Sequence, residues 1–239
     1  MIVGCIQARM GSTRLPGKVL REFAGLSTLA WVVRALGAAG VCDEIVVATT
    51  VRPEDNVVEA ESVRLGARVF RGHPDDVLSR YVAVAQDYGG DRIIRVTADN
   101  PLIDPDVVRA CAQFEIGSVD LVTTGPPNSL PLGLDVEVVT RHCLERIDRE
   151  ATGSYRSHVT ALAYEHPERY HLEVLQFTPP APDLRVTLDT PEDEACIAAI
   201  VGRLGSGPFA WGDIVTLLRR YPEIAGLNSG IRQKPLDAG

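Results

Sequence analysis

The sequence predicts an α/β fold with three layers, in which helices cover both faces of a mostly parallel, mixed β-sheet. Short runs of β-branched and apolar residues alternate along the first half with segments whose apolar residues recur every three or four positions. Hydrophobic residues make up 45% of the 239-residue chain and charged residues 23%, as in ordinary globular proteins. A chain of this length and composition buries a large core without needing a disulfide or a metal ion.

Strands and helices alternate regularly in the first half of the chain. Strands are expected at residues 1–7, 44–50, 68–71 and 92–97. Helices are expected after the N-cap candidate Ser27, at 53–65, at 75–88 and after the N-cap candidate Asp104. This alternation places the strands in parallel, and in such sheets ligands bind beyond the carboxyl ends of the strands.

The second half is less regular, because prolines at 126–131 and 179–182 interrupt it. Strands are expected at 120–123, 135–140, 171–177 and 185–188, and helices at 141–150, at 155–164 and from Thr190 onward. Residues 126–182 are therefore expected to form a small inserted lobe on a single domain that spans residues 1–239. The strand at 185–188 should return to the main sheet and bring Asp189 to its ligand-binding edge.

Charge and cysteine usage exclude several classes of protein. The net charge is −8 and the pI is about 5.2, which argues against a nucleic-acid binder. The five cysteines are scattered and form no C-x-x-C pair, which is typical of free thiols in a reducing cytoplasm. The N-terminus does not resemble a signal peptide, and no stretch is long and apolar enough for a membrane span. We therefore expect a cytoplasmic protein that binds neither nucleic acid nor membrane.

The loop after the first strand concentrates positive charge. Residues 7–18 include Arg9, Arg14 and Lys18 together with two glycines and two hydroxyl side chains. Glycines let backbone N–H groups approach an anion, and the cations neutralise it, so the loop predicts a polyphosphate site. It is not a P-loop, because five residues separate Gly11 from Gly17 and a valine follows the lysine. The alternative is a basic surface loop.

Two acids follow expected strands. Asp99 comes two residues after the strand at 92–97, and Asp189 comes directly after the strand at 185–188. If both strands lie in the sheet, both carboxylates project from its ligand edge, where together with phosphate oxygens they suit Mg²⁺. Taken singly, each aspartate also fits a turn or a helix cap. The pair Asp104 and Asp106 resembles a D-x-D metal motif, but the proline between them favours a helix start.

Several segments together resemble the cytidylyltransferase superfamily, which includes the CMP-sialic acid and CMP-3-deoxy-manno-octulosonate synthetases. They are IQARMGSTRLPGKVL, FRGHPDDVLSRY, RVTADNPLIDPDVV, GLDVEVV and RVTLDTPEDE. They are most similar to the branch of spore coat polysaccharide biosynthesis protein F, from Ile2 to about Asn228. The resemblance implies a Rossmann-like nucleotidyltransferase of the glycosyltransferase-A type that acts in polysaccharide biosynthesis. It implies transfer of CMP from CTP to a hydroxyl of a sugar acid or related small acidic acceptor, with release of pyrophosphate, and a homodimer formed through residues 126–182.

The resemblance also implies roles for individual residues. The catalytic residues it implies are Lys18, Arg14, Asp99 and Asp189, of which the two aspartates would hold Mg²⁺. The nucleotide-binding residues it implies are Ala8, Arg9, Gly11, Ser12, Arg14, Lys18, Arg71, Gly72, Asp76, Val77, Thr97 and Asp99. The acceptor-binding residues it implies are Asp135, Glu137 and His158. Thr97 stands where the synthetases often place a glutamine that contacts the base.

The expected chemistry is an in-line attack of the acceptor hydroxyl on the α-phosphorus of CTP, with Lys18 and Arg14 stabilising the leaving pyrophosphate. The alternative is a glycosyltransferase of the same fold that consumes a nucleotide sugar. The cation-rich loop argues against it, because a triphosphate needs more cations than a diphosphate sugar. A third possibility is a nucleotide-binding protein without catalytic activity, against which the presence of both aspartates and the lysine argues.

Overall fold

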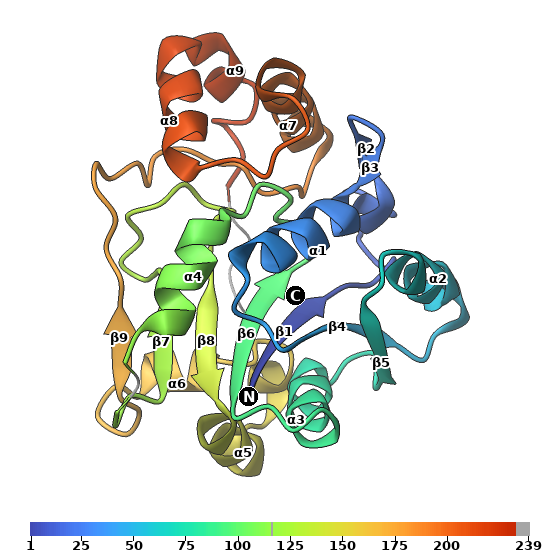
Figure 1. Ribbon diagram of the computed structural model, residues 1–239, viewed down its shortest axis with the longest axis vertical. Coiled ribbons are helices and arrows are strands. Elements are labelled where there is room, and N and C mark those ends of the chain that lie inside the picture. The colour runs from blue at the N-terminus through green and yellow to red at the C-terminus, as the bar shows by residue number, and fades with distance from the viewer. Residues whose placement is uncertain (116, 233–239) are drawn as a thin grey trace.

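Seven strands form the main sheet of the computed structural model, which describes residues 1–115 and 117–232. The strand order is β5-β4-β1-β6-β8-β7-β9 (Figure 1). The parallel part consists of β1 (Ile2–Gln7), β4 (Glu44–Thr50), β5 (Arg68–Gly72) and β6 (Arg92–Thr97). The antiparallel β8 (Glu137–Thr140) lies between β6 and β7 (Leu121–Thr123), and β9 (Leu172–Val174) pairs in parallel with β7. The mostly parallel, mixed sheet expected from the sequence is confirmed.

Helices cover both faces of this sheet because each presents an apolar stripe to one of two cores. One core receives side chains from α1 (Thr28–Ala39), α2 (Asn56–Arg64), α4 (Pro105–Gln113), α7 (Pro191–Leu204), α8 (Trp211–Arg220) and α9 (Pro222–Gly226). The other receives side chains from α3 (Val77–Asp87), α5 (Arg141–Glu150) and α6 (Ala161–Glu165). Figure 1 shows α7, α8 and α9 gathered at the top of the view, above α1 and α4. A short hairpin of β2 (Glu22–Phe23) and β3 (Leu26–Ser27) precedes α1.

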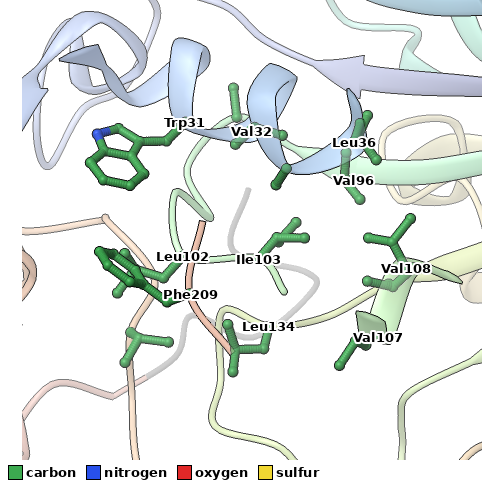
Figure 2. Close-up of a cluster of buried hydrophobic side chains, with 14 of the residues drawn as sticks. Trp31, Val32, Leu36, Val96, Leu102, Ile103, Val107, Val108, Leu134 and Phe209 are labelled. Atoms are coloured by element: carbon green, nitrogen blue, oxygen red, sulfur yellow. The ribbon is translucent and has the colours of Figure 1, made fainter. Parts of the chain in front are cut away.

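The first core fixes the segment that follows β6. Figure 2 shows side chains of α1 facing Leu102 and Ile103, which are each 1% exposed. In the same cluster Trp31 stacks on Phe209 with 5.5 Å between the ring centroids. Burying both Leu102 and Ile103 is worth about 2 kcal/mol for each side chain. Asp99 lies three residues before Leu102, so this core also fixes the backbone that carries Asp99.

The expectation of a main-sheet strand at 185–188 was wrong. This segment is extended, but its only ladder contact among the described residues is a single bridge between Leu132 and Arg185. It cannot join β6, because β1 pairs with one edge of that strand and β8 pairs with the other. Instead the Leu188 N–H donates to the Asp99 carbonyl oxygen at 2.8 Å, so the segment crosses the end of β6. Asp189 nevertheless reaches the carboxyl edge of the sheet.

Two expected helices are also divided. Residues 53–65 begin with a 3₁₀ turn at Pro53–Asp55 before α2, and residues 155–164 are not one helix. A 3₁₀ turn at Gly153–Arg156 and α6 are separated by a turn at 157–160. The break has a polar cause, because the Thr160 hydroxyl at the end of that turn donates to Glu137 of the sheet.

The domain expected over residues 1–239 includes residues 116 and 233–239, which lie outside the described residues. Within the part expected to form an inserted lobe, β8 is a central strand of the main sheet and α5 packs against α3. In the described part of the chain, no helix has the length and apolar character that a membrane crossing needs.

Candidate active site

The cation-rich loop leaves β1 at the carboxyl edge of the sheet and is fixed there by a buried acid. The Met10 N–H donates to Oδ1 of Asp55 at 2.7 Å, and the Thr50 hydroxyl donates to Oδ2 of the same carboxylate. Gly17 has a φ of 69°, a left-handed conformation that favours glycine just before Lys18. Asp55, which is 2% exposed, was not among the residues predicted from the sequence. Its place in the expected helix at 53–65 gave no sign of a contact with the loop.

Lys18 joins the loop to both aspartates. Its Nζ lies 2.5 Å from Oδ2 of Asp99 and 2.7 Å from Oδ1 of Asp189. Nη2 of Arg14 lies 2.9 Å from Oδ2 of Asp189. Burial opposes the charged form of Lys18, but the two carboxylates outweigh it and raise the pKa of the ammonium group. The structure thus brings together the four residues that the sequence analysis expected to be catalytic.

A second ion-pair network holds Asp189 in place. The Nε and Nη2 atoms of Arg185 each lie 2.8 Å from the carboxylate of Asp193, and Nη2 lies 3.2 Å from Asp189. The Asp193 carboxylate also accepts the backbone N–H groups of Asp189 and Thr190, at 3.0 and 3.1 Å. Thr190 and Asp193 form the capping box of α7. Arg185 and Asp193 were not predicted as positioning residues.

This network should make the folded protein sensitive to acid. Burial alone would raise the pKa of Asp193, but Arg185 and Asn228 outweigh it and hold the pKa of this carboxyl below its usual range. A depressed folded-state pKa adds stability above the unfolded value of 3.8, and that stability is lost as pH falls through the folded value. We expect the free energy of unfolding, measured by urea titration, to fall as the pH drops below about 4.

Asp193→Asn is the matched variant for this pH dependence, because it keeps the side chain's shape and removes its charge. We expect a lower free energy of unfolding at pH 7 and a shallower decline from pH 5 to pH 3. A decline in the variant as steep as in the wild type would assign the acid sensitivity to other carboxyl groups.

Two cavities meet at this cluster. The smaller, of about 320 Å³, has cations and hydroxyls in its wall, including Arg9, Ser12, Thr13 and Lys18. The larger cavity, of about 470 Å³, is lined by residues of β6 and by several residues between positions 123 and 164. They include Arg95, Asn128, Asp135, Glu137, His158 and Tyr164. Arg14, Thr97, Asp99 and Asp189 line both. The arrangement can hold a polyanion on one side of the two acids and a polar molecule on the other.

The predicted nucleotide-binding residues divide into two groups. Arg9, Gly11, Ser12, Arg14, Lys18, Thr97 and Asp99 line the smaller cavity. Ala8 is buried in the core and, together with Arg71, Gly72, Asp76 and Val77, is absent from the described lining of both cavities. Arg71 of β5 and Asp76 at the start of α3 instead form hydrogen bonds and ion pairs with neighbouring protein groups. The guanidinium of Arg71 donates to the Thr50 and Arg52 carbonyl oxygens and pairs with Glu59 at 2.6 Å. Asp76 caps α3 and pairs with Arg156 at 2.6 Å.

All three predicted acceptor-binding residues line the larger cavity, but two already have partners. Glu137 accepts from Arg95 at 2.9 Å, from the Thr160 hydroxyl at 3.0 Å and from the Tyr164 hydroxyl at 2.7 Å. Asp135 accepts from the Asn128 amide at 2.9 Å. Burial raises the pKa of the Asp135 carboxyl, so this group is less readily ionised than an exposed aspartate.

Gly133 supports this wall of the cavity through a close backbone approach. Its φ is 106°, and a Cβ atom there would lie 2.4 Å from the backbone nitrogen of Thr187. We expect Gly133→Ala to destabilise the protein by about 3 kcal/mol or more, because the clash would displace the segment that leads to Asp189. Urea unfolding measures the change.

Gly212→Ala is the control, since a Cβ on this helical glycine meets no atom within 4 Å. It should raise stability by up to about 1 kcal/mol. Equal unfolding midpoints for the two alanine variants would contradict the close approach at Gly133.

The two aspartates fit a divalent cation. A single ammonium group already lies within 2.7 Å of both carboxylates, so the pair accommodates a shared cation. No group of three or more histidine, cysteine or acidic residues that could hold a metal occurs among the described residues. Two carboxylates alone leave most of the ligand positions of Mg²⁺ to phosphate oxygens and water, as is usual in nucleotide sites.

Comparisons of sequence point to one family. The family model described as Cytidylyltransferase matches residues 3–200. The chain is 37% identical over 235 residues to the spore coat polysaccharide biosynthesis protein SpsF of Bacillus subtilis, covering 94% of this chain and 96% of that protein. It is 34% identical to a 3-deoxy-manno-octulosonate cytidylyltransferase of Acidobacterium capsulatum, covering 68% of this chain and 72% of that enzyme. The similarity to the Bacillus subtilis protein therefore extends over nearly the whole chain, including the residues that line both cavities.

Solved structures share the fold. A cytidylyltransferase from Leptospira borgpetersenii superposes with a TM-score of 0.91 at 27% identity, covering 98% of this chain and 99% of that one. A CMP:2-keto-3-deoxy-manno-octonic acid synthetase complexed with CTP superposes with a TM-score of 0.65 at 17% identity, covering 84% of this chain and 98% of that one. At that lower identity the likeness is one of fold.

Proposed function

This chain belongs to the cytidylyltransferase family, and we propose that it transfers CMP from CTP to a hydroxyl group of a small acceptor and releases pyrophosphate. The observation that carries the proposal is the contact of Lys18 with Asp99 and Asp189 at the junction of the two cavities. The smaller cavity, lined by cations, suits the triphosphate. The larger cavity then takes the acceptor, whose hydroxyl reaches the α-phosphorus beside the two acids.

The protein's contribution to the reaction is positioning and charge. Arg9, Ser12 and the backbone near Gly11 would bind the triphosphate, and Lys18 and Arg14 would stabilise the charge that builds on the leaving pyrophosphate. Asp99 and Asp189 would hold Mg²⁺, which when bound neutralises phosphate oxygens and favours ionisation of the attacking hydroxyl. Positioning the hydroxyl and the phosphate in line removes much of the entropic barrier.

Lys18 should compete with the metal ion in the free protein. Its ammonium group lies between the two carboxylates, so a divalent cation can reach them only when Lys18 moves toward phosphate oxygens. We expect Lys18→Met to bind Mn²⁺ at least about 10-fold more tightly than the wild type in the absence of nucleotide, because a competing charge is removed. Electron paramagnetic resonance of free Mn²⁺ measures this affinity without any turnover.

Lys18→Arg is the control for this measurement, because it keeps a cation at the carboxylates and should bind Mn²⁺ as weakly as the wild type. Equal Mn²⁺ affinities of Lys18→Met and the wild type would show that Lys18 does not occupy the metal position.

The finer features of the proposal rest on relatives and on local observations. We propose a sugar acid or a related small acid as acceptor, supported by the 3-deoxy-manno-octulosonate cytidylyltransferases among the relatives. A place in polysaccharide biosynthesis is supported by the name of the Bacillus subtilis relative. A homodimer through residues 126–182 is supported by β9, which lies within that range and at one edge of the sheet. A cytoplasmic location is supported by five free cysteines.

The test is a pyrophosphate-release assay with each of the four nucleoside triphosphates, Mg²⁺ and a panel of sugar acids. We expect pyrophosphate with CTP and at least about 10-fold less with the other nucleotides. Release of a nucleoside diphosphate from a nucleotide sugar would instead assign a glycosyltransferase. CTP binding without turnover on any acceptor would favour a protein that only binds nucleotides.

A further inference from the structure

Arg95 is a half-buried cation in the wall of the larger cavity, and the proposed reaction does not yet give it a role. It lies on β6, two residues before Thr97 and on the same face of the sheet. Its side chain is 20% exposed, and it lines the larger cavity together with Glu137, to which it is directly paired across β6 and β8. Arg14 is the one other arginine or lysine in the described wall of this cavity, and it is paired with Asp189.

The guanidinium of Arg95 is only partly satisfied. Nη1 donates to Oε2 of Glu137 at 2.9 Å, and this is its only hydrogen bond to a described residue. Nε is buried and has no hydrogen-bond partner in the described chain. Burial opposes the charged form, but Glu137 outweighs it and raises the pKa of Arg95, so the group stays ionised. The guanidinium therefore has donor capacity that no described residue uses.

The acids of the same wall are occupied. Glu137 already accepts from three side chains, Arg95, Thr160 and Tyr164. Asp135 already accepts from the Asn128 amide and the Gly133 N–H. Donor capacity that no described residue uses remains at the guanidinium, and planar guanidinium N–H groups suit an oxyanion.

We propose that Arg95 binds an oxyanion of the acceptor, a carboxylate or a phosphate group, and that Glu137, Thr160 and Tyr164 hold the guanidinium in position for it. The inference rests on the proposed function, because it assigns the acceptor to the larger cavity. Glu137 is then a positioning residue rather than a direct ligand of the acceptor. Arg95 and Thr97 are about 7 Å apart along one face of β6, and Thr97 lines both cavities, so the bound anion lies within a small molecule's length of the phosphates.

The test is calorimetric titration of the CMP-loaded protein with matched pairs of probes. Gluconate carries a carboxylate and has sorbitol as its neutral counterpart, and glucose 6-phosphate carries a phosphate and has glucose as its neutral counterpart. We expect at least one anionic probe to bind about 10-fold or more tightly than its neutral counterpart, and the probe that does so identifies the oxyanion. Equal affinities within every pair, or no binding by any anionic probe, would overturn the proposal.

Variants locate the effect at Arg95. Arg95→Met should weaken the anionic probe about 30-fold, and Arg95→Lys should recover only part of that loss because it lacks the fork. The double variant Arg95→Met/Glu137→Gln removes both charges of this ion pair. It therefore tests the loss of Arg95 without leaving the Glu137 carboxylate unpaired. Arg141→Met changes an exposed helix arginine outside both cavities and should bind like the wild type.

The affinity for CTP separates this inference from the proposed function. We expect CTP to bind Arg95→Met within about 2-fold of the wild type, because Arg95 is absent from the described lining of the smaller cavity. Normal CTP binding with unchanged binding of the anionic probe in Arg95→Met would refute the role of Arg95 alone. Failure of the wild type to bind CTP would refute the proposed function.

Discussion

Replacing Asp99 with asparagine should lower the rate of pyrophosphate release from CTP by at least about 1,000-fold. The substitution keeps the size of the side chain but removes one of the two charges that would hold the metal ion. It leaves the Asp99 carbonyl oxygen, which accepts from Leu188, in place. The fold should therefore persist, with near-ultraviolet circular dichroism like that of the wild type.

Asp106→Asn is the matched control. Asp106 belongs to the D-x-D sequence at the start of α4, but its side chain is 75% exposed and pairs with Arg109 on the same helix. Its neighbour Asp104 caps α4, as expected from the sequence. We expect Asp106→Asn to keep the wild-type rate. Activity of Asp99→Asn within 10-fold of the wild type would remove Asp99 from the catalytic residues.

Replacing Lys18 with alanine should have a similarly large effect, with kcat/KM for CTP falling by about 1,000-fold. The side chain is the shared partner of Asp99 and Asp189 and lines the smaller cavity. Removing it leaves two carboxylates facing each other, so the melting temperature should also fall at neutral pH. Steady-state kinetics and thermal unfolding measure the two effects.

Mg²⁺ separates the two contributions of Lys18. Because the free carboxylates can then share a metal ion, Mg²⁺ should raise the melting temperature of Lys18→Ala by more than it raises that of the wild type. It should not restore turnover, since no group replaces the ammonium at the phosphates. Turnover of Lys18→Ala that recovers as the Mg²⁺ concentration is raised would show that Lys18 only fills the metal position.

Much of the fold follows from local patterns in the sequence. The apolar runs at 44–50 and 92–97 form β4 and β6 at the expected bounds, because β-branched residues bounded by polar loops fit buried parallel strands. The caps Ser27 and Asp104 begin α1 and α4 through hydrogen bonds that three or four consecutive residues can make. Such signals are local, so a single sequence contains them.

Pairing partners are not local, and this is where the expectations were less successful. The segment at 185–188 has the composition of a strand, yet no free edge of β6 remains for it. Arg71 was expected in the nucleotide site from the resemblance alone, and at the edge strand β5 its guanidinium contacts backbone carbonyl groups and Glu59. Nothing within a few residues of either position reveals which neighbours the fold supplies.

The site shows the same division. Lys18 was predicted from its cation-rich loop, and Asp99 and Asp189 from their places after strand-like runs; their catalytic roles came from the resemblance to the cytidylyltransferases. The residues that fix them, Asp55 and Asp193, act from other segments through buried hydrogen bonds. A buried carboxylate in a helix start looks like a cap in sequence, and only the three-dimensional contacts show that it positions a residue of the candidate site.

The most direct test of the site is the anomalous difference density of Mn²⁺ in crystals grown with the metal and a non-hydrolysable CTP analogue. We expect one peak within about 2.5 Å of carboxylate oxygens of both Asp99 and Asp189, with Lys18 displaced onto phosphate oxygens. Density for Lys18 still between the two acids, with the metal and the triphosphate bound elsewhere, would contradict the proposed mechanism.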